Sequence, residues 1–317
     1  MRDSVLLIVS IDTEEDNWYR SRQGVTCRNI DELRRQAAVF ARLGIRPTYF
    51  TTYQVARDAR AADVMREVGT GGEIAAHLHP WNTPPLTEAF VPRNSMLKNL
   101  PADLQLAKLE TLTRALEEVF GARPEAFRAG RYGLGPATVS ALARCGYVVD
   151  SSVTPFVSWK AFDEGPAFFG APLDVYRIAP GRRVTEPAED GLIEVPLSCG
   201  FGRRPFGLWD RLHRALDVPG LRRARSLCKR IVLSPETATA QDMLTLSRRL
   251  LERGVRHLHV TWHSPSLQPG LGPFTRTSAD VDRLYGAVET YLDHLSAITT
   301  LNPVTVSEAA AVEAAAC

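Results

Sequence analysis

The 317-residue chain has no long apolar run and almost no excess of either charge. It contains 38 lysine and arginine residues against 36 aspartate and glutamate residues, which gives a formal net charge of +2. A balanced chain lacks the basic field that attracts nucleic acids and anionic membranes. No stretch approaches the ~20 apolar residues of a membrane-spanning helix. These absences argue against a nucleic-acid partner and a membrane span, and they favour a small or weakly charged partner.

Cysteine is also scarce, because the five cysteines are scattered along the chain and none forms a Cys-x-x-Cys pair. An odd number without paired spacing predicts free thiols in a reducing compartment. The first residues lead directly into an apolar segment without the architecture of a signal peptide. The expected location is therefore cytoplasmic. The sequence does not determine the oligomeric state.

The chain does contain a repeated alternation of apolar runs and helical periods. The run Val5–Ile11 is apolar almost throughout, which is typical of a parallel strand buried on both faces. Further strands are expected at residues 47–51, 73–78, 126–127, 257–262 and 304–306, and helices at residues 31–43, 55–68, 102–120, 136–145, 241–254 and 278–296. This alternation predicts an α/β fold with a parallel sheet, either a closed barrel or an open doubly wound sheet.

The domain organisation is expected to be simple, because no linker divides the chain. With 44% hydrophobic residues, residues 1–308 can bury one large core as a single domain. Within it, residues 154–240 are expected to form a long irregular insertion, since residues 154–191 are rich in proline, glycine and aromatic residues without a helical period. Residues 309–317 form an alanine-rich tail that continues a helix or frays.

Acidic residues and histidines follow two of the expected strands. After the first strand, Asp12 and Glu14 share one parity and should point the same way, although a solvated acidic loop is the alternative. At the end of the third strand, His77 and His79 project from one face of an extended segment. Two imidazoles in this spacing, near a carboxylate, favour a metal site with Zn²⁺ chemistry over a structural role.

Two more clusters lie where later strands end. Residues 127–133 combine glycines with Arg128 and Arg131, so an arginine here can hold a carboxylate ionised, and a structural salt bridge is the alternative. In the segment 257–263 all three histidines share one parity. His263 is nearest the carboxyl end and is the candidate general acid, whereas His257 and His259 are expected deeper in the core.

In chain order, these four clusters resemble the motifs of the polysaccharide deacetylase family, the NodB-homology carbohydrate esterases. The resemblance spans roughly residues 6–308 and implies a distorted (β/α) barrel that binds one divalent metal, commonly Zn²⁺. Residues 10–14 look like the family's Thr-Phe-Asp-Asp motif, which implies that Asp12 is the catalytic base. Thr13 stands where the metal-binding carboxylate usually lies, and by analogy with branches that use an Asp-x-Asp spacing the metal role passes to Glu14. Glu15 and Asp16 remain open as alternatives.

The second motif departs from the usual His-x-x-x-His pattern, because Trp81 lies four residues after His77. The segment is similar instead to a branch with a His-x-His-Pro-Trp form, which implies that His79 is the second histidine ligand. The metal ligands are therefore expected to be Glu14, His77 and His79.

The remaining motifs imply the other catalytic roles. Arg128 resembles the arginine that orients the base, and His263 resembles the histidine that acts as general acid. Asp150 is the expected carboxylate that tunes this histidine. The implied activity is hydrolysis of the N-acetyl group of an amino sugar or glycan precursor.

Four residues are expected to bind the N-acetylated substrate: backbone N–H groups near Arg131 or Tyr132 for the oxyanion, and Trp81 and Tyr19 as stacking surfaces. Trp18 is a further candidate for stacking, whereas Trp262 is expected to be core. Two other functions stay open. One is a non-catalytic sugar-binding protein, because Thr13 and Trp81 depart from the common metal motif. The other is a metal-dependent hydrolase of the amidohydrolase kind, which also uses a His-x-His pair on a barrel strand.

Overall fold

The computed structural model describes residues 4–18, 25–218, 221 and 227–315. Its strands are β1 (Ser4–Thr13), β2 (Thr48–Thr51), β3 (Glu73–Leu78), β4 (Ala126–Ala129), β5 (Val149–Asp150), β6 (Tyr176–Ile178), β7 (Leu192–Glu194), β8 (Cys199–Phe201), β9 (Arg230–Val232), β10 (His257–His263) and β11 (Thr300–Val304). Its α-helices are α1 (Leu33–Arg42), α2 (Tyr53–Arg57), α3 (Ala59–Gly69), α4 (Ala102–Phe120), α5 (Pro136–Arg144), α6 (Phe206–Ala215), α8 (Ala240–Leu251), α9 (Ser278–Ser296) and α10 (Val306–Ala314).

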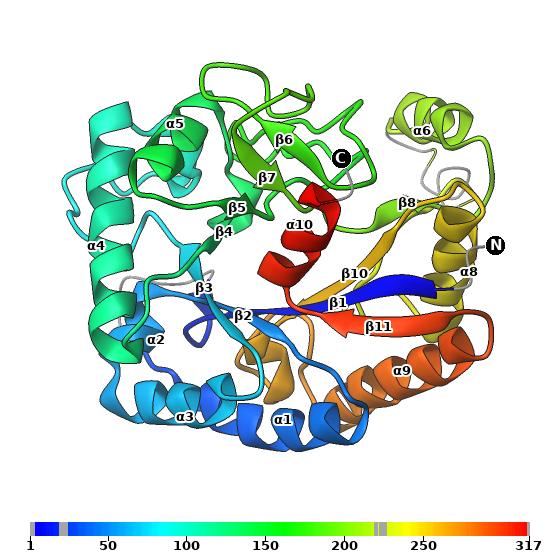
Figure 1. The fold of residues 1–317 in the computed structure, drawn as a ribbon, viewed down its shortest axis with the longest axis horizontal. Coiled ribbons are helices and arrows are strands. Elements are labelled where there is room, and N and C mark those ends of the chain that lie inside the picture. The colour runs from blue at the N-terminus through cyan, green and yellow to red at the C-terminus, as the bar shows by residue number, and fades with distance from the viewer. Residues whose placement is uncertain (1–3, 19–24, 219–220, 222–226, 316–317) are drawn as a thin grey trace.

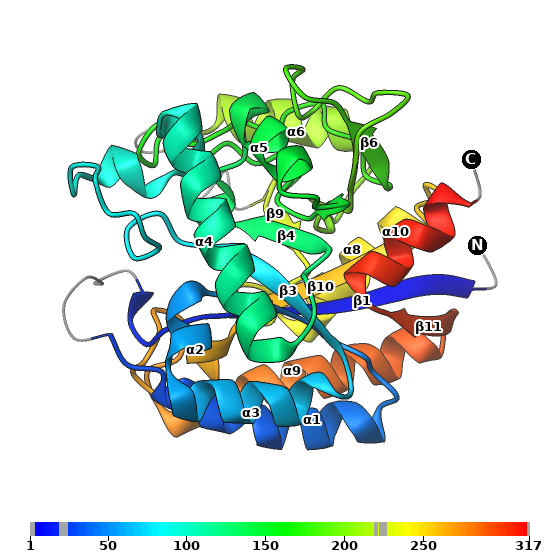
Figure 2. The same cartoon turned by 60° about the vertical axis from the view of Figure 1, so that its left-hand side comes forward.

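Nine of the described strands form one sheet that curls into a half-barrel with helices around it (Figures 1 and 2). The order is β10-β1-β2-β3-β4-β5-β7-β6, with β11 paired to the beginning of β1. All neighbouring strands are parallel except β6 and β7. The prediction of an α/β fold with a distorted barrel is confirmed. The strands β8 and β9 form a separate antiparallel pair.

The inner face of the curled sheet is apolar at one end and polar at the other. Because strand side chains alternate between faces, β1 presents Ile8, Ser10 and Asp12 inward in succession. Ile8 packs with inward residues of β2, β3, β4, β5 and β7 and with α10, which closes the amino-terminal end of the half-barrel (Figure 1). This plug leaves the carboxyl ends of the strands as the end where polar side chains gather.

The outer face of the sheet is covered by helices, and Figure 2 shows α1, α3 and α9 along one side. Leu7, Val9 and Ile11 of β1 contribute to this outer core. Trp262 of β10 also belongs to it and packs edge-on against Phe40 of α1, with ring centroids 5.8 Å apart. Trp262 is therefore a core residue, as the sequence predicted.

Among the boundaries that differ from the sequence prediction, helix capping explains two. The single helix expected over residues 55–68 is divided into α2 and α3, because Asp58 is extended and its carboxylate accepts a hydrogen bond from the Ala61 amide. The last strand was expected at residues 304–306 but ends at Val304. There, Thr305 and Glu308 form a capping box that begins α10.

Where the structure describes residues 154–240, they form four short strands, β6 to β9, and the helix α6. Of these, β7 extends the main sheet beside β5, and β6 forms its antiparallel edge. Four of the cysteines are described, and all four are free thiols. No helix of the described residues is long and apolar enough to cross a membrane.

Candidate active site

The register of the parallel strands brings the sequence-predicted polar residues to one edge. Asp12 of β1 lies opposite His263 of β10, and His77 of β3 lies opposite Arg128 of β4. These four side chains meet because the carboxyl ends of parallel strands lie at the same end of a sheet. The loops that follow β1 and β3 add Glu14 and His79.

Glu14, His77 and His79 form a buried cluster with the composition of a metal site. Their potential ligand atoms all lie within 4.8 Å of one another. Glu14 Oε2 is 3.1 Å from His79 Nε2 and 3.6 Å from His77 Nε2. The other Glu14 oxygen, Oε1, is buried with no hydrogen-bond partner among the described residues. A buried carboxylate with an orphaned oxygen beside two imidazoles fits a divalent cation.

In both histidines, the ring nitrogen that faces away from the cluster donates a hydrogen bond. His77 Nδ1 donates to the Arg128 carbonyl at 3.0 Å, and His79 Nδ1 donates to Glu15 Oε1 at 3.0 Å. These bonds direct both Nε2 atoms at Glu14, as in the outer shell of metal-bound histidines. Burial lowers the pKa of His79, but the carboxylates of Glu15 and Glu14 outweigh it and raise the pKa to about 9.

The three acidic residues after β1 therefore have different surroundings. Glu15 also accepts hydrogen bonds from Asn82 Nδ2 and Thr52 Oγ1. Asp16 faces away, where its carboxylate accepts hydrogen bonds from Asn29 and from other groups of residues 26–28. Only Glu14 of the three belongs to the His77–His79 cluster.

Asp12 lies between this cluster and His263. Its Oδ1 accepts a hydrogen bond from Arg128 Nη1 at 2.5 Å, whereas its Oδ2 faces His77 Nε2 at 4.0 Å and His263 Nε2 at 3.7 Å. Burial raises the pKa of Asp12, but Arg128 and the two histidines outweigh it and hold the pKa at about 2. The carboxylate is therefore ionised at neutral pH, with Oδ1 bonded to Arg128 and Oδ2 facing His77 and His263.

Arg128 is itself fixed on every side. Its Nε donates to the Ser151 carbonyl at 2.8 Å, and its Nη1 also donates to Thr261 Oγ1 at 3.0 Å. Its guanidinium carbon lies 4.1 Å from the centre of the Phe50 ring. A buried guanidinium with these partners positions Asp12 rigidly.

His263 is paired with a carboxylate that the sequence did not suggest. Its Nδ1 donates to Glu236 Oε2 at 2.8 Å, and its backbone amide donates to Glu236 Oε1 at 3.1 Å. The hydroxyl of Ser266 donates to the same carboxylate. Burial lowers the pKa of His263, but Glu236, Glu14 and Asp12 outweigh it and raise the pKa to about 10. The imidazole is therefore protonated at neutral pH, with Nε2 turned toward Asp12.

The expected pairing of Asp150 with His263 is wrong. Asp150 accepts hydrogen bonds from the Ser152 amide at 3.0 Å and the Ser152 hydroxyl at 2.8 Å, and its other neighbour is Glu194. Burial raises the pKa of Asp150. Burial also raises the pKa of Glu194, and the neighbouring Asp150 carboxylate raises it further, so that it lies well above its ordinary value. Asp150 lies at the end of β5 with its carboxylate bonded to Ser152, and the partner of His263 is Glu236 instead.

Comparison with known proteins places this geometry on a known scaffold. No protein-family model matches the sequence, and no curated protein matches it. A Mycobacterium smegmatis protein provisionally described as a polysaccharide deacetylase superposes with a TM-score of 0.58 and 17% identity, over 99% of this chain and 91% of its own. A Parabacteroides distasonis protein provisionally described as a glycoside hydrolase/deacetylase superposes with a TM-score of 0.61 and 13% identity, over 96% of this chain and 70% of its own.

The chain has the polysaccharide deacetylase fold. The same fold extends to Puue allantoinase, which superposes with a TM-score of 0.52 and 13% identity, over 96% of this chain and 88% of its own. The deacetylase fold explains why the reactive side chains gather at the carboxyl ends of the strands.

On this deacetylase fold, a cavity of about 190 Å³ opens over the reactive groups. Asp12, Glu14, His77, His79 and His263 line it. The aromatic side chains of Trp18, Tyr132, Trp159, Phe162 and Phe274 complete its wall together with Arg131. The ring of His263 is stacked between those of Trp18 and Phe274, with centroids 6.0 Å and 5.5 Å away.

The expected substrate residues occupy different places around this cavity. Arg131 and Tyr132 have φ angles of 53° and 58°, a left-handed conformation that is strained for such residues and is concentrated at functional sites. The Tyr132 ring is stacked on Trp159 at 5.1 Å. Trp81 is buried and stacked on His79 at 4.2 Å. Tyr19 lies outside the described residues.

The sequence did not reveal two carboxylates that accept hydrogen bonds from histidines of the site, Glu236 and Glu15. Glu236 follows the apolar run Ile231–Leu233, which was the available signal, but this run lies in a range expected to be irregular and forms β9 of the separate antiparallel pair. Glu15 was recognised only as an alternative metal ligand, because parity along the strand does not reveal which side chain turns back to a histidine.

Proposed function

We propose that the protein is a metal-dependent hydrolase that removes the N-acetyl group from an amino sugar. One observation carries the proposal. Along one cavity, the ionised Asp12 lies between a Glu14–His77–His79 cluster and a protonated His263. An amide hydrolase needs these three elements together: a cation site, a base and an acid. A sugar-binding protein needs neither the base nor the acid.

Glu14, His77 and His79 are the residues that would hold the cation. One carboxylate and two imidazoles, with room for substrate on the cavity side, suit Zn²⁺ among common metals. A cation bound there supplies Lewis-acid chemistry, which polarises an amide carbonyl and makes water acidic near neutral pH.

Asp12 and His263 would then move the protons. Asp12 Oδ2 accepts a proton from the attacking water, while Arg128 keeps Oδ1 occupied and the carboxylate in place. His263 Nε2 donates a proton to the departing amine, and Glu236 holds the imidazole in the required orientation through Nδ1. The strained backbone at Arg131 and Tyr132 would present N–H groups to the developing oxyanion.

Metal analysis combined with an acetate-release screen tests the proposal. We expect about one zinc ion per chain, and acetate release from at least one N-acetylhexosamine glycoside that is lost when Glu14→Gln removes the cation. The matched control is Glu67→Gln, an exposed carboxylate on α3. A protein that binds zinc and N-acetylated sugars but releases no acetate would instead be a non-catalytic sugar-binding protein.

A further inference from the structure

A second and larger cavity, of about 410 Å³, adjoins the catalytic cavity. The two share Trp18 and Arg131 in their walls. The Trp18 ring lies 6.0 Å from the His263 ring on one side and 6.5 Å from the Trp81 ring on the other, which makes it the partition between the cavities. Ligand sites usually measure ~300–1,000 Å³, so the catalytic cavity by itself is small and the neighbouring cavity provides the missing room.

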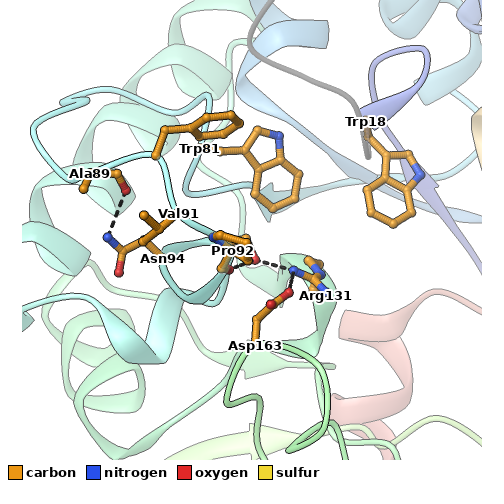
Figure 3. Close-up of a pocket in the computed structure, with 10 residues that line it drawn as sticks. Trp18, Trp81, Ala89, Val91, Pro92, Asn94, Arg131 and Asp163 are labelled. Atoms are coloured by element: carbon orange, nitrogen blue, oxygen red, sulfur yellow. Dashed lines mark hydrogen bonds and ion pairs between the residues drawn. The ribbon is translucent and has the colours of Figure 1, made fainter.

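The larger cavity is walled mainly by apolar groups. Figure 3 shows the rings of Trp18 and Trp81 along one side, with Val91, Pro92 and Arg131 across from them. Ala89 and Phe90 extend the apolar wall. Phe90 is 62% exposed and Val91 is 47% exposed, so two neighbouring apolar side chains form a contiguous exposed patch at the cavity, a feature that often marks a ligand-binding groove.

Two of the polar side chains of this cavity, Asn94 and Ser95, donate hydrogen bonds to the protein itself. Asn94 Nδ2 donates to the Ala89 carbonyl at 2.9 Å, and Ser95 Oγ donates to the Pro92 carbonyl at 2.5 Å. A second sugar ring would have to bury several hydroxyls against these occupied groups. A buried hydroxyl without a partner costs roughly 1–3 kcal/mol, so the wall is poorly suited to a sugar ring.

The charges of this cavity are also paired. Among the described residues that line it, only Arg131 and Asp163 are charged, and their side chains are joined at 2.6 Å (Figure 3). Arg131 also donates to Ser95. The described part of the wall therefore offers no uncompensated cation for a phosphate or a nucleotide diphosphate.

We propose that this cavity binds an uncharged apolar group attached to the amino sugar, such as an alkyl or aryl aglycone. This inference rests on the proposed function, because it places the acetamide of the same molecule in the catalytic cavity. The aglycone lies between the Trp18 and Trp81 rings and the exposed side chains of Phe90 and Val91. Its burial covers these side chains and increases affinity in proportion to the apolar area removed from water.

Four N-acetylglucosamine compounds separate the possible occupants: the methyl glycoside, the octyl glycoside, the β-1,4-linked disaccharide and the uridine diphosphate conjugate. We expect kcat/KM for the octyl glycoside to exceed that for the methyl glycoside by at least about tenfold. The disaccharide and the nucleotide conjugate should gain little over the methyl glycoside. Equal values for octyl and methyl, or a preference for either polar compound over octyl, would overturn the inference.

A paired variant tests the residues. Phe90→Ser with Val91→Ser should reduce the octyl advantage by about tenfold while leaving turnover of the methyl glycoside nearly unchanged. The control is Leu208→Ser, an exposed apolar side chain of α6 that lines neither cavity. An equal loss on both glycosides would contradict the assignment.

A binding measurement separates this inference from the proposed function. Octyl β-glucoside carries no acetamide, so calorimetric titration reports on the apolar cavity without catalysis. Binding that depends on Phe90 and Val91, without acetate release from any compound, would refute the deacetylase and keep the subsite. Acetate release without any preference for the octyl glycoside would support the deacetylase and refute the apolar subsite.

Discussion

At the scale of single residues, neighbouring charges decide what each titratable group can do. Asp12, buried between Arg128, His77 and His263, keeps a low pKa, whereas His263 beside Glu236 keeps a high one. Two groups whose pKa values are pushed apart in this way can serve as base and acid in the same site. Three predictions follow from these surroundings.

Replacing Asp12 with asparagine should remove nearly all turnover and leave the metal content nearly intact. The amide keeps the size of the side chain but cannot accept the proton. Metal analysis and acetate release on the same preparation check this. Loss of the metal would show that Asp12 is a ligand and that the base lies elsewhere.

His263→Ala should lower kcat by about 10²–10⁴-fold with little change in substrate binding, because the acid acts only as the C–N bond breaks. The loss should be smaller for an acetate ester, whose leaving group needs less protonation. Turnover of a matched ester and amide decides the matter. Equal losses on both would make His263 a structural or binding residue.

Glu236→Gln should move the alkaline limb of the kcat/KM profile to lower pH. Removing the carboxylate lowers the pKa of His263 from about 10 toward its ordinary ~6.5, so the acid form is lost earlier. In the wild type, the stability that this pair contributes is complete below about pH 6.5 and is lost as pH rises through about 10. An unchanged limb, or an unchanged His263 titration by NMR, would contradict the assignment.

At the scale of elements, one lysine ties the loop after β3 to the helix α4. Lys108 is fully buried, and its Nζ donates to the carbonyls of Pro80, Thr83 and Pro85 at 2.7–2.8 Å and to Glu88 Oε1 at 3.1 Å. This loop follows β3 and carries His79 and Trp81, and Trp81 lines the larger cavity. The ammonium therefore helps to position one wall of that cavity.

Lys108→Met should lower the free energy of unfolding by about 3–5 kcal/mol, because it leaves a buried carboxylate and three carbonyls without their donor. Zinc affinity should fall as well, since His79 borders the loosened loop. Denaturant titration and metal titration measure the two effects. Lys160→Met, at an exposed position, is the matched control, and equal effects of the two changes would refute the role of Lys108.

At the scale of the whole molecule, the proposed metal site joins distant parts of the chain. Glu14 follows β1, whereas His77 and His79 lie at the end of β3, with β2 between the two strands in the sheet. An ion held by these residues links two loops that unfolding separates. Anything that binds only the folded state raises its stability by mass action.

Added Zn²⁺ should therefore raise the Tm of the metal-free protein by several degrees, since saturation at 100 times Kd contributes about 2.7 kcal/mol. The rise should vanish in Glu14→Gln and persist in Glu236→Gln, whose carboxylate contacts His263 instead of the cluster. Differential scanning calorimetry tests this. A similar rise in both variants would place the ion elsewhere.

The sequence by itself determined the fold class and much of the site. Hydrophobic periodicity located β1, β3 and β10. Strand parity predicted that Asp12 and Glu14 point the same way and that His263 is the histidine of its strand nearest the carboxyl end. Because parallel strands end at one edge, Asp12, Glu14, His77, His79, Arg128 and His263 were expected to meet, and the structure brings them together.

Only the tertiary structure decided which groups are partners. Glu236 reaches His263 across 27 residues of chain, and Asp163 reaches Arg131 across 32. Such contacts depend on how loops fold over the strand ends, which periodicity does not encode. The same holds for Asp150, whose carboxylate bonds to Ser152 and not to His263. Pattern along the chain determines which edge a side chain reaches, and packing between loops determines what it meets there.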